Sequence, residues 1–189
     1  MTIYLDKREI PDWGDFWIGV LDQHLCYLKL PPEHPQEGLV GDAIPRDIAD
    51  FAVRQNLTLT IRRVRLGAEI WGQLEEYLAG TRRQFDLPIR LLGTDFQRQV
   101  WQALQAIPWG STRTYQDIAA DLGNPLSARA VGQANGRNPI SIVVPCHRVL
   151  AKNGLGGYSG GLGLKERLLR IEGVLGNVIR DGKGEAIEA

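Results

Sequence analysis

The first 92 residues mix strand-like and helix-like patterns of apolar positions. The patterns predict a hairpin, two helices and a returning strand, over residues 16–30, 45–54, 67–79 and 85–91. Asp22-Gln23 supplies the hairpin turn, the proline-rich run 31–35 ends the hairpin, and Gly80 stops the second helix. We therefore expect an α/β N-terminal domain over residues 1–92 that joins the rest of the chain at 92–94.

From residue 93 onward the apolar positions recur mainly at helical spacing. Thr94 and Thr114 are predicted to cap two helices. Two further helices are predicted over residues 127–136 and 164–171. The turn residues 123–125 separate the second helix from the third, which is the outline of a helix-turn-helix. Any helical hairpin has the same outline, so the pattern by itself predicts only a mainly helical C-terminal domain.

Charge separates the two halves of the chain. The whole sequence carries 22 basic and 22 acidic residues. Residues 1–92 have 11 basic and 14 acidic side chains, whereas residues 93–189 have 11 and 8. The net charge of +3 hints at an anionic partner for the C-terminal half, although an ordinary solvated surface has the same composition.

Composition argues against several classes of protein. Two cysteines, Cys26 and Cys146, do not make a disulfide framework, and we expect both to be reduced. We find no signal-peptide pattern and no apolar run near the roughly 18 residues that a membrane span needs. We therefore expect a soluble, cytoplasmic protein with no membrane partner. His24 and Cys26 are explained by alternation in a strand, so no metal site and no cofactor are expected.

The candidate chemistry of the chain is concentrated around Cys146. The apolar run 142–144 is long enough for one buried strand and stops at Pro145, which places the cysteine at the end of an element. A thiol reacts as the thiolate, and its reference pKa of about 8.5 requires help from a neighbouring base or cation. His147 and Arg148 are the candidates for that help. The alternative is a structural cysteine in the core, because free cysteine is among the most buried residue types.

The predicted third helix has an unusually small surface. Its small residues are Ala128, Ala130, Gly132, Ala134 and Gly136. They surround Arg129, Gln133 and Asn135, and small side chains let a backbone approach a bulky partner closely. A solvated surface charge is the alternative interpretation of Arg129. The composition of the glycine-rich run 153–161 is also compatible with a flexible surface loop. The run lacks the Gly-Lys-Ser or Gly-Lys-Thr of a phosphate loop.

The sequence Pro145-Cys146-His147-Arg148-Val149 closely resembles the active-site region of the O6-alkylguanine-DNA alkyltransferases, also called methylated-DNA-protein-cysteine methyltransferases. Residues 134–139 before it and 157–161 after it extend the resemblance, which runs from about Phe96 to Gly173. The resemblance implies a ribonuclease-H-like N-terminal domain without chemistry over residues 1–92 and a mainly helical, winged-helix-like DNA-binding domain over residues 93–175. Residues 176–189 are polar and contain glycine, so we expect them to be a frayed tail.

The resemblance also implies a reaction. An alkyl group would move from guanine O6 in DNA, or thymine O4, to the protein's own cysteine without a cofactor. Glu172 would orient His147, His147 would take the Cys146 proton through a water, and the thiolate would attack the alkyl carbon. Tyr115 would donate towards the departing guanine, and Asn138 matches the family's hinge asparagine. The thioether product has no easily hydrolysed bond, so each molecule would react once.

The implied partner is double-stranded DNA that contains alkylated guanine, bound by a monomer. The resemblance places the third helix in the minor groove and requires the damaged base to be flipped out of the stack. Arg129 matches the family's arginine finger, which fills the vacated space. The implied DNA contacts are Tyr115, Ser127, Ala128, Arg129, Gln133, Asn135 and Gly136. The implied guanine pocket is lined by Pro145, Val149, Tyr158 and Ser159.

Two other classes of function remain as alternatives. A non-catalytic binder of alkylated bases would keep the groove and the pocket but replace the nucleophile, whereas Cys146 is present. A helix-turn-helix transcription regulator would need a second DNA-binding or activation segment, for which we see no room in 189 residues.

Overall fold

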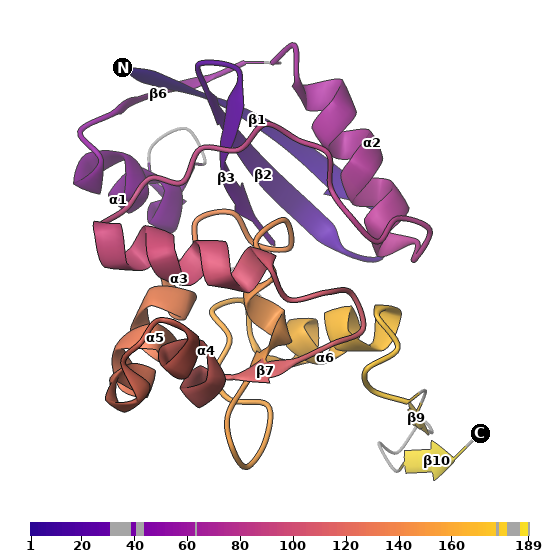
Figure 1. Ribbon diagram of the computed structural model, residues 1–189. Coiled ribbons are helices and arrows are strands. Elements are labelled where there is room, and N and C mark those ends of the chain that lie inside the picture. The colour runs from indigo at the N-terminus through magenta and orange to yellow at the C-terminus, as the bar shows by residue number, and fades with distance from the viewer. Residues whose placement is uncertain (31–38, 41–43, 63, 177, 181–185, 189) are drawn as a thin grey trace.

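The computed structural model has two parts, a sheet flanked by helices and a group of helices (Figure 1). It describes residues 1–30, 39–40, 44–62, 64–176, 178–180 and 186–188. The sheet has the order β3-β2-β1-β6 and is formed by β1 (Thr2–Ile10), β2 (Gly14–Leu21), β3 (His24–Lys29) and β6 (Thr58–Ile61). Its first three strands are antiparallel, and β6 pairs parallel with β1. The predicted combination of a mixed α/β part and a mainly helical part is confirmed.

The central hairpin forms where the apolar alternation predicted it. β2 and β3 pair antiparallel, and both turn residues, Asp22 and Gln23, have positive φ values of 49° and 62°. Such angles match the twist of a two-residue hairpin turn. β1 is an addition to the predicted elements, although its buried Ile3 and Leu5 alternate with more exposed neighbours. The predicted end of the hairpin at residues 31–35 lies outside the described residues.

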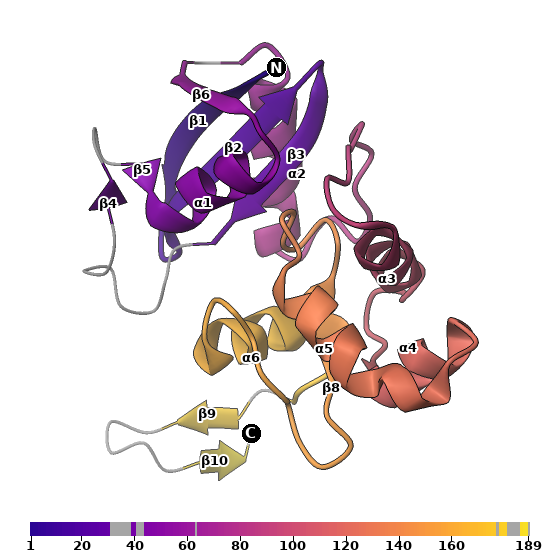
Figure 2. The same cartoon turned by 90° about the vertical axis from the view of Figure 1, so that its left-hand side faces the viewer.

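Two helices cover opposite faces of the sheet (Figure 2). Both helices were predicted, over residues 45–54 and 67–79. They are α1 (Arg46–Arg54) and α2 (Gly67–Leu78). Even-numbered residues of β2 pack with α2, and its odd-numbered residues pack with α1, because successive side chains of a strand point to opposite faces. Gly80 ends the α2 region with a φ of +74°. A short antiparallel pair, β4 (Leu39–Val40) and β5 (Ile44–Pro45), precedes α1.

The predicted strand over residues 85–91 is wrong. Within the described residues of that segment, only Ile89 forms a bridge, to Leu25. Two hydrogen bonds hold it, from Leu25 N to Pro88 O at 2.8 Å and from Arg90 N to Leu25 O at 2.9 Å. Proline has no N–H to donate to a ladder. The segment therefore runs along the sheet edge with one bridge in place of a strand.

The described C-terminal part contains four α-helices. They are α3 (Asp95–Gln105), α4 (Tyr115–Asp121), α5 (Ala128–Gly136) and α6 (Leu162–Ile171). Thr94 and Thr114 cap α3 and α4 as predicted, and each forms a capping box. A 3₁₀ turn over Pro125–Ser127 joins α4 to α5, and the short strands β7 (Arg113–Thr114) and β8 (Val149–Leu150) pair parallel. The buried face of α3 consists of Val100, Trp101 and Leu104, whereas Phe96 is 37% exposed.

The segment before the cysteine is a turn, so the predicted buried strand over residues 142–144 is wrong. Asn138 donates from Nδ2 to Val144 O at 2.8 Å and accepts at Oδ1 from Ile140 N at 3.0 Å. These side-chain bonds occupy backbone groups that a strand would pair with a neighbouring strand. Ile142 has a φ of +71°, which is a strained angle for a β-branched residue.

The sheet supports this turn directly. Leu28 of β3 donates to Pro139 O at 2.8 Å and accepts from Ser141 N at 2.9 Å. One apolar cluster also continues from α2 through α3 and α5 to α6. The division of the chain into two domains at residue 92 therefore stays a prediction, because the core crosses that point.

The described residues of the tail form an antiparallel pair, β9 (Val178–Arg180) and β10 (Ala186–Glu188). The frayed tail stays a prediction, because only these two short strands of the segment beyond Gly176 lie within the described residues. In the described part of the chain, no helix is long and apolar enough to cross a membrane.

Candidate active site

Cys146 is the first residue of a 3₁₀ turn, Cys146–Arg148, that follows Pro145. It is 2% exposed. Burial raises the pKa of the thiol, while hydrogen bonding from Asn138 and the charges of Lys29 and Lys165 act in the lowering direction. The thiol of the free protein is therefore protonated near neutral pH. Attack by this sulfur requires a base that accepts its proton.

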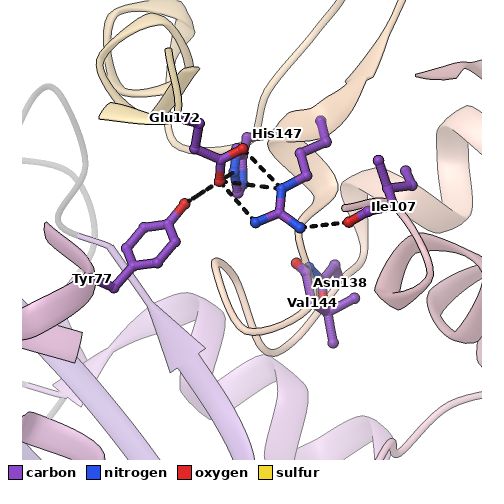
Figure 3. Close-up of polar contacts among 7 residues, drawn as sticks. Tyr77, Ile107, Asn138, Val144, His147 and Glu172 are labelled. Atoms are coloured by element: carbon purple, nitrogen blue, oxygen red, sulfur yellow. Dashed lines mark hydrogen bonds and ion pairs between the residues drawn. The ribbon is translucent and has the colours of Figure 1, made fainter. Parts of the chain in front are cut away.

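His147 is fully buried and is bonded on one side of its ring (Figure 3). Its Nε2 lies 2.8 Å from Oε1 of Glu172, which is a hydrogen-bond acceptor as a carboxylate. Its Nδ1 is buried and has no hydrogen-bond partner among the described residues. Burial lowers the pKa of His147, although the hydrogen bond and charge of Glu172 act in the opposite direction. A neutral ring with the proton on Nε2 leaves Nδ1 free to accept a proton.

Glu172, at the C-terminal end of α6, accepts several hydrogen bonds with its carboxylate. Arg148 donates from Nε to Oε2 at 2.9 Å and from Nη2 to Oε1 at 2.9 Å, in addition to the bond with His147. Burial by itself would raise the pKa of Glu172, but these bonds and one from Tyr77 lower the pKa to about 2. Arg148 thus compensates the buried carboxylate, and it also donates to Ile107 O at 2.6 Å. The expected help of Arg148 to the thiol is therefore indirect.

Tyr77, a buried residue of α2, also belongs to this network. Its hydroxyl donates to Oε1 of Glu172 at 2.5 Å and lies 3.2 Å from Nε2 of His147 (Figure 3). The sequence contains no signal for this role, because a tyrosine at helical spacing looks the same whether it packs or bonds. Through Tyr77, the N-terminal part of the chain contributes a side chain to the site.

Lys165 is a second residue that sequence reasoning missed. It is fully buried on α6 and donates from Nζ to Val149 O at 2.6 Å and to Leu155 O. Burial lowers its pKa to about 8, although the charge of Cys146 acts in the raising direction. A signal was present in the sequence, since Lys165 lies on the same helical face as Leu168 and Glu172.

Tyr115 and Tyr158 lie close enough to Cys146 for its charge to raise the pKa of both hydroxyls, after the larger effect of burial. Tyr115 starts α4 and donates to Gly157 O at 3.4 Å. A Cβ atom at Gly156 would lie 3.1 Å from the Tyr115 ring, so a larger residue there would displace the ring. The structure thus brings these two predicted site residues together around the sulfur.

The other predicted pocket residues differ in exposure. Pro145 and Val149 are buried beside the cysteine, whereas Ser159 is exposed. Asn138 is 2% exposed and holds the turn before the cysteine, and its role as a hinge stays a prediction. In the described part of the chain, no group of three possible metal ligands comes together.

The predicted DNA-binding residues lie along α5 and its N-terminal turn, apart from Tyr115 at the start of α4. Arg129, Gln133 and Gly136 are exposed, and Ser127 and Ala128 are half-buried. Asn135 was predicted to contact DNA, but its side chain is buried, and the contact stays a prediction. Its Nδ2 donates to Cys146 O at 3.4 Å, and its Oδ1 is enclosed. Asn135 faces inward because its position on the helix is one turn from Val131, which is also buried.

A buried cysteine followed by a histidine that is bonded to a carboxylate is the arrangement of a protein with a cysteine nucleophile. The small-faced helix with its exposed arginine lies in the same half of the molecule.

Comparison with known proteins narrows this class. Residues 95–174 match the family profile described as "6-O-methylguanine DNA methyltransferase, DNA binding domain". A crystal structure of the O6-methylguanine methyltransferase of Mycobacterium tuberculosis is 37% identical, has a TM-score of 0.70, and aligns over 90% of this chain and 92% of that chain. The enzyme of Pyrococcus kodakaraensis KOD1 is 31% identical with a TM-score of 0.64, over 91% of this chain and 99% of that one.

Sequence relatives agree with this result. A methylated-DNA–protein-cysteine methyltransferase of Methanosarcina acetivorans is 57% identical over 102 residues, which are 53% of this chain. The aligned part spans 65% of that relative's length. The chain belongs to the O6-methylguanine DNA methyltransferase family.

Proposed function

We propose that this protein repairs DNA by moving an alkyl group from O6 of guanine to its own Cys146. The single observation that carries the proposal is the buried thiol next to His147, whose Nε2 lies 2.8 Å from the carboxylate of Glu172. The names of the relatives support the same reaction, since they are methylated-DNA–protein-cysteine methyltransferases.

The proposed reaction is a single displacement at carbon. The Sγ–H of Cys146 gives its proton, through a bridging water, to Nδ1 of His147. The thiolate then forms the S–C bond as the bond between the alkyl carbon and guanine O6 breaks. The electron pair of that bond leaves on guanine, towards which the Tyr115 hydroxyl donates. Glu172 stabilises the imidazolium, and the thioether product is inert to water, so the protein acts once.

The proposed partner is double-stranded DNA, bound along α5. A relative from Mycobacterium tuberculosis that is 36% identical to this chain was crystallised in complex with DNA. Within this proposal α4 and α5 form a helix-turn-helix of winged-helix type, and the sheet part is ribonuclease-H-like. The damaged base leaves the stack to reach the buried sulfur, and Arg129 occupies its place. The proposal also includes the cytoplasmic location that was expected from the sequence.

The proposal is tested by following the lesion itself. A duplex with one O6-methylguanine is mixed with increasing amounts of protein, and the nucleosides are separated after digestion. We expect O6-methylguanine to be replaced by unmodified guanine, with one lesion repaired per protein molecule. Cys146→Ser should repair none, because a hydroxyl is much harder to ionise than a thiol. Binding without loss of the lesion by the unaltered protein would instead support a lesion-binding protein.

A further inference from the structure

The hydroxyl of Tyr77 is buried at the centre of the site and comes from a different part of the chain than the other site residues. It lies 2.5 Å from Oε1 of Glu172 and 3.2 Å from Nε2 of His147, and the side chain is fully buried. The ring packs against Phe85 and Trp109, each with centroids 5.2 Å away. This packing fixes the direction in which the hydroxyl points.

The protons of this cluster can be assigned from the chemistry of its members. Glu172 is a carboxylate and can only accept, so the Tyr77 hydroxyl donates to it. Burial and the charge of Glu172 raise the pKa of Tyr77 far above its ordinary value, so the hydroxyl keeps its proton. The Tyr77 oxygen then presents a lone pair to Nε2 of His147. Both neighbours of Nε2 therefore favour a proton on that nitrogen.

We propose that Tyr77 is a positioning residue for the alkyl transfer: it holds Oε1 of Glu172 and favours the tautomer of His147 in which Nδ1 accepts the proton of Cys146. This inference rests on the function proposed above. It also assigns a part in the reaction to α2, in the half of the chain that the sequence resemblance treats as support. Tyr77 acts through His147 and does not contact the reacting atoms.

The test uses Tyr77→Phe, which removes the hydroxyl and keeps the ring in place. The chain offers a matched control, because Tyr27 is also buried and donates to a carboxylate, Oδ2 of Asp47, at 2.7 Å. Tyr27→Phe thus removes a tyrosine–carboxylate bond of similar length, to a half-exposed carboxylate, in the other apolar cluster. Free O6-benzylguanine is the substrate, since it needs no DNA binding, and mass spectrometry follows benzyl transfer in a single turnover.

We expect Tyr77→Phe to react about tenfold more slowly than the unaltered protein, which is the effect of losing one hydrogen bond to a charged group. Tyr27→Phe should react at the unaltered rate per folded molecule. An unaltered rate for Tyr77→Phe, or equal losses in both variants, would overturn the inference. A lack of benzyl transfer in the unaltered protein would instead refute the proposed function.

The pH dependence separates positioning from a loss of stability. The charged and titratable groups around His147 are Glu172 and Lys165 of α6, Arg148 of its own turn, and Tyr77 of α2. Without the Tyr77 bond, more of the Glu172 charge acts on the ring and raises the pKa of His147, so the ring is protonated, and unable to accept a proton, up to a higher pH. The slower reaction above that pH comes from the lost tautomer preference. The acid limb of the rate profile should therefore move to higher pH in Tyr77→Phe. A slower reaction with an unchanged limb would indicate a structural role and contradict the inference.

Two further measurements keep the inference testable if Tyr77→Phe folds poorly. In the unaltered protein near neutral pH, nitrogen NMR of His147 should show a protonated Nε2 and an unprotonated Nδ1. The opposite tautomer would overturn the inference. In a His147→Gln background, the slow residual benzyl transfer should not fall further when Tyr77→Phe is added, because the base through which Tyr77 acts is gone. A further tenfold loss would contradict the proposed route.

Discussion

At the scale of single residues, Glu172 organises the site more than the thiol does. Its carboxylate accepts from His147, Arg148 and Tyr77, and it is 4% exposed. A buried carboxylate is stable only when its partners replace the lost water. The end of α6 would by itself disfavour a negative charge, because the helix dipole is negative there. The neighbouring Arg148 removes that conflict, and the charge remains available to stabilise a protonated His147.

The first prediction concerns the acid stability that Glu172 provides. Its pKa is about 2 in the folded protein and 4.5 ordinarily, so its stabilisation is complete above about pH 4.5 and is lost as pH falls towards 2. Glu172→Gln should lower the free energy of unfolding at pH 7 by about 3 kcal/mol, because Arg148 loses its buried partner. Urea unfolding measured from pH 7 to pH 2 should show this difference shrinking with acid.

Glu166→Gln is the control for this experiment, since Glu166 lies on the same helix and its ion pair with Arg170, at 3.7 Å, is partly exposed. Exposed pairs contribute little, so this variant should remain close to the unaltered protein at every pH. A Glu172→Gln difference that stays constant from pH 7 to pH 2 would contradict the assigned pKa.

At the scale of elements, residues close together in the sequence were enough to predict some helix ends but not the turn before the cysteine. Thr94 and Thr114 were predictable because a capping box depends on residues three apart. The run 142–144 was not, because the same apolar residues suit a strand or a buried turn. Asn138 favours the turn, because its side chain forms the hydrogen bonds with Ile140 N and Val144 O that a neighbouring strand would otherwise form. The role of Tyr77 depends on residues far apart in sequence and could not be predicted locally.

The second prediction belongs to α5. Arg129 is exposed at the start of this helix, where under the proposed function it enters the DNA. Arg129→Ala should slow repair of O6-methylguanine in a duplex by about tenfold or more, because no side chain would fill the space that the flipped base leaves in the stack. Reaction with free O6-benzylguanine should change little. Single-turnover rates on both substrates measure this, with the exposed Arg83→Ala as the control. Equal losses on the two substrates would place Arg129 in the fold or the pocket.

At the scale of the whole molecule, one face of the sheet and the C-terminal helices share an apolar cluster that includes the cysteine. The apolar cluster contains residues of α2, α3 and α5 together with Cys146 itself. Leu28 of the sheet holds the turn that precedes the cysteine, and Tyr77 reaches the buried histidine. The sulfur therefore lies in a cluster to which both parts of the molecule contribute side chains.

The third prediction follows from this shared core. An alkyl group on Cys146 adds volume at a site that is 2% exposed, and overpacking of a core costs about 1–3 kcal/mol. Alkylated protein should therefore unfold at a lower temperature than free protein, and the benzylated form at a lower temperature than the methylated form. Calorimetry on the three forms, each freed of DNA, tests this order. Midpoints that stay level or rise across the series would show that the pocket adapts.

The most direct test of the account asks which sulfur receives the methyl group. The protein is incubated with a duplex that contains O6-methylguanine, digested, and sequenced by tandem mass spectrometry. Cys26 is the internal control, because burial raises its pKa to about 12 and it donates only to Gly19 O at 3.3 Å. We predict one methyl group per molecule, on Cys146. A methyl group on Cys26, or an unmodified Cys146 after the lesion has been repaired, would contradict the account.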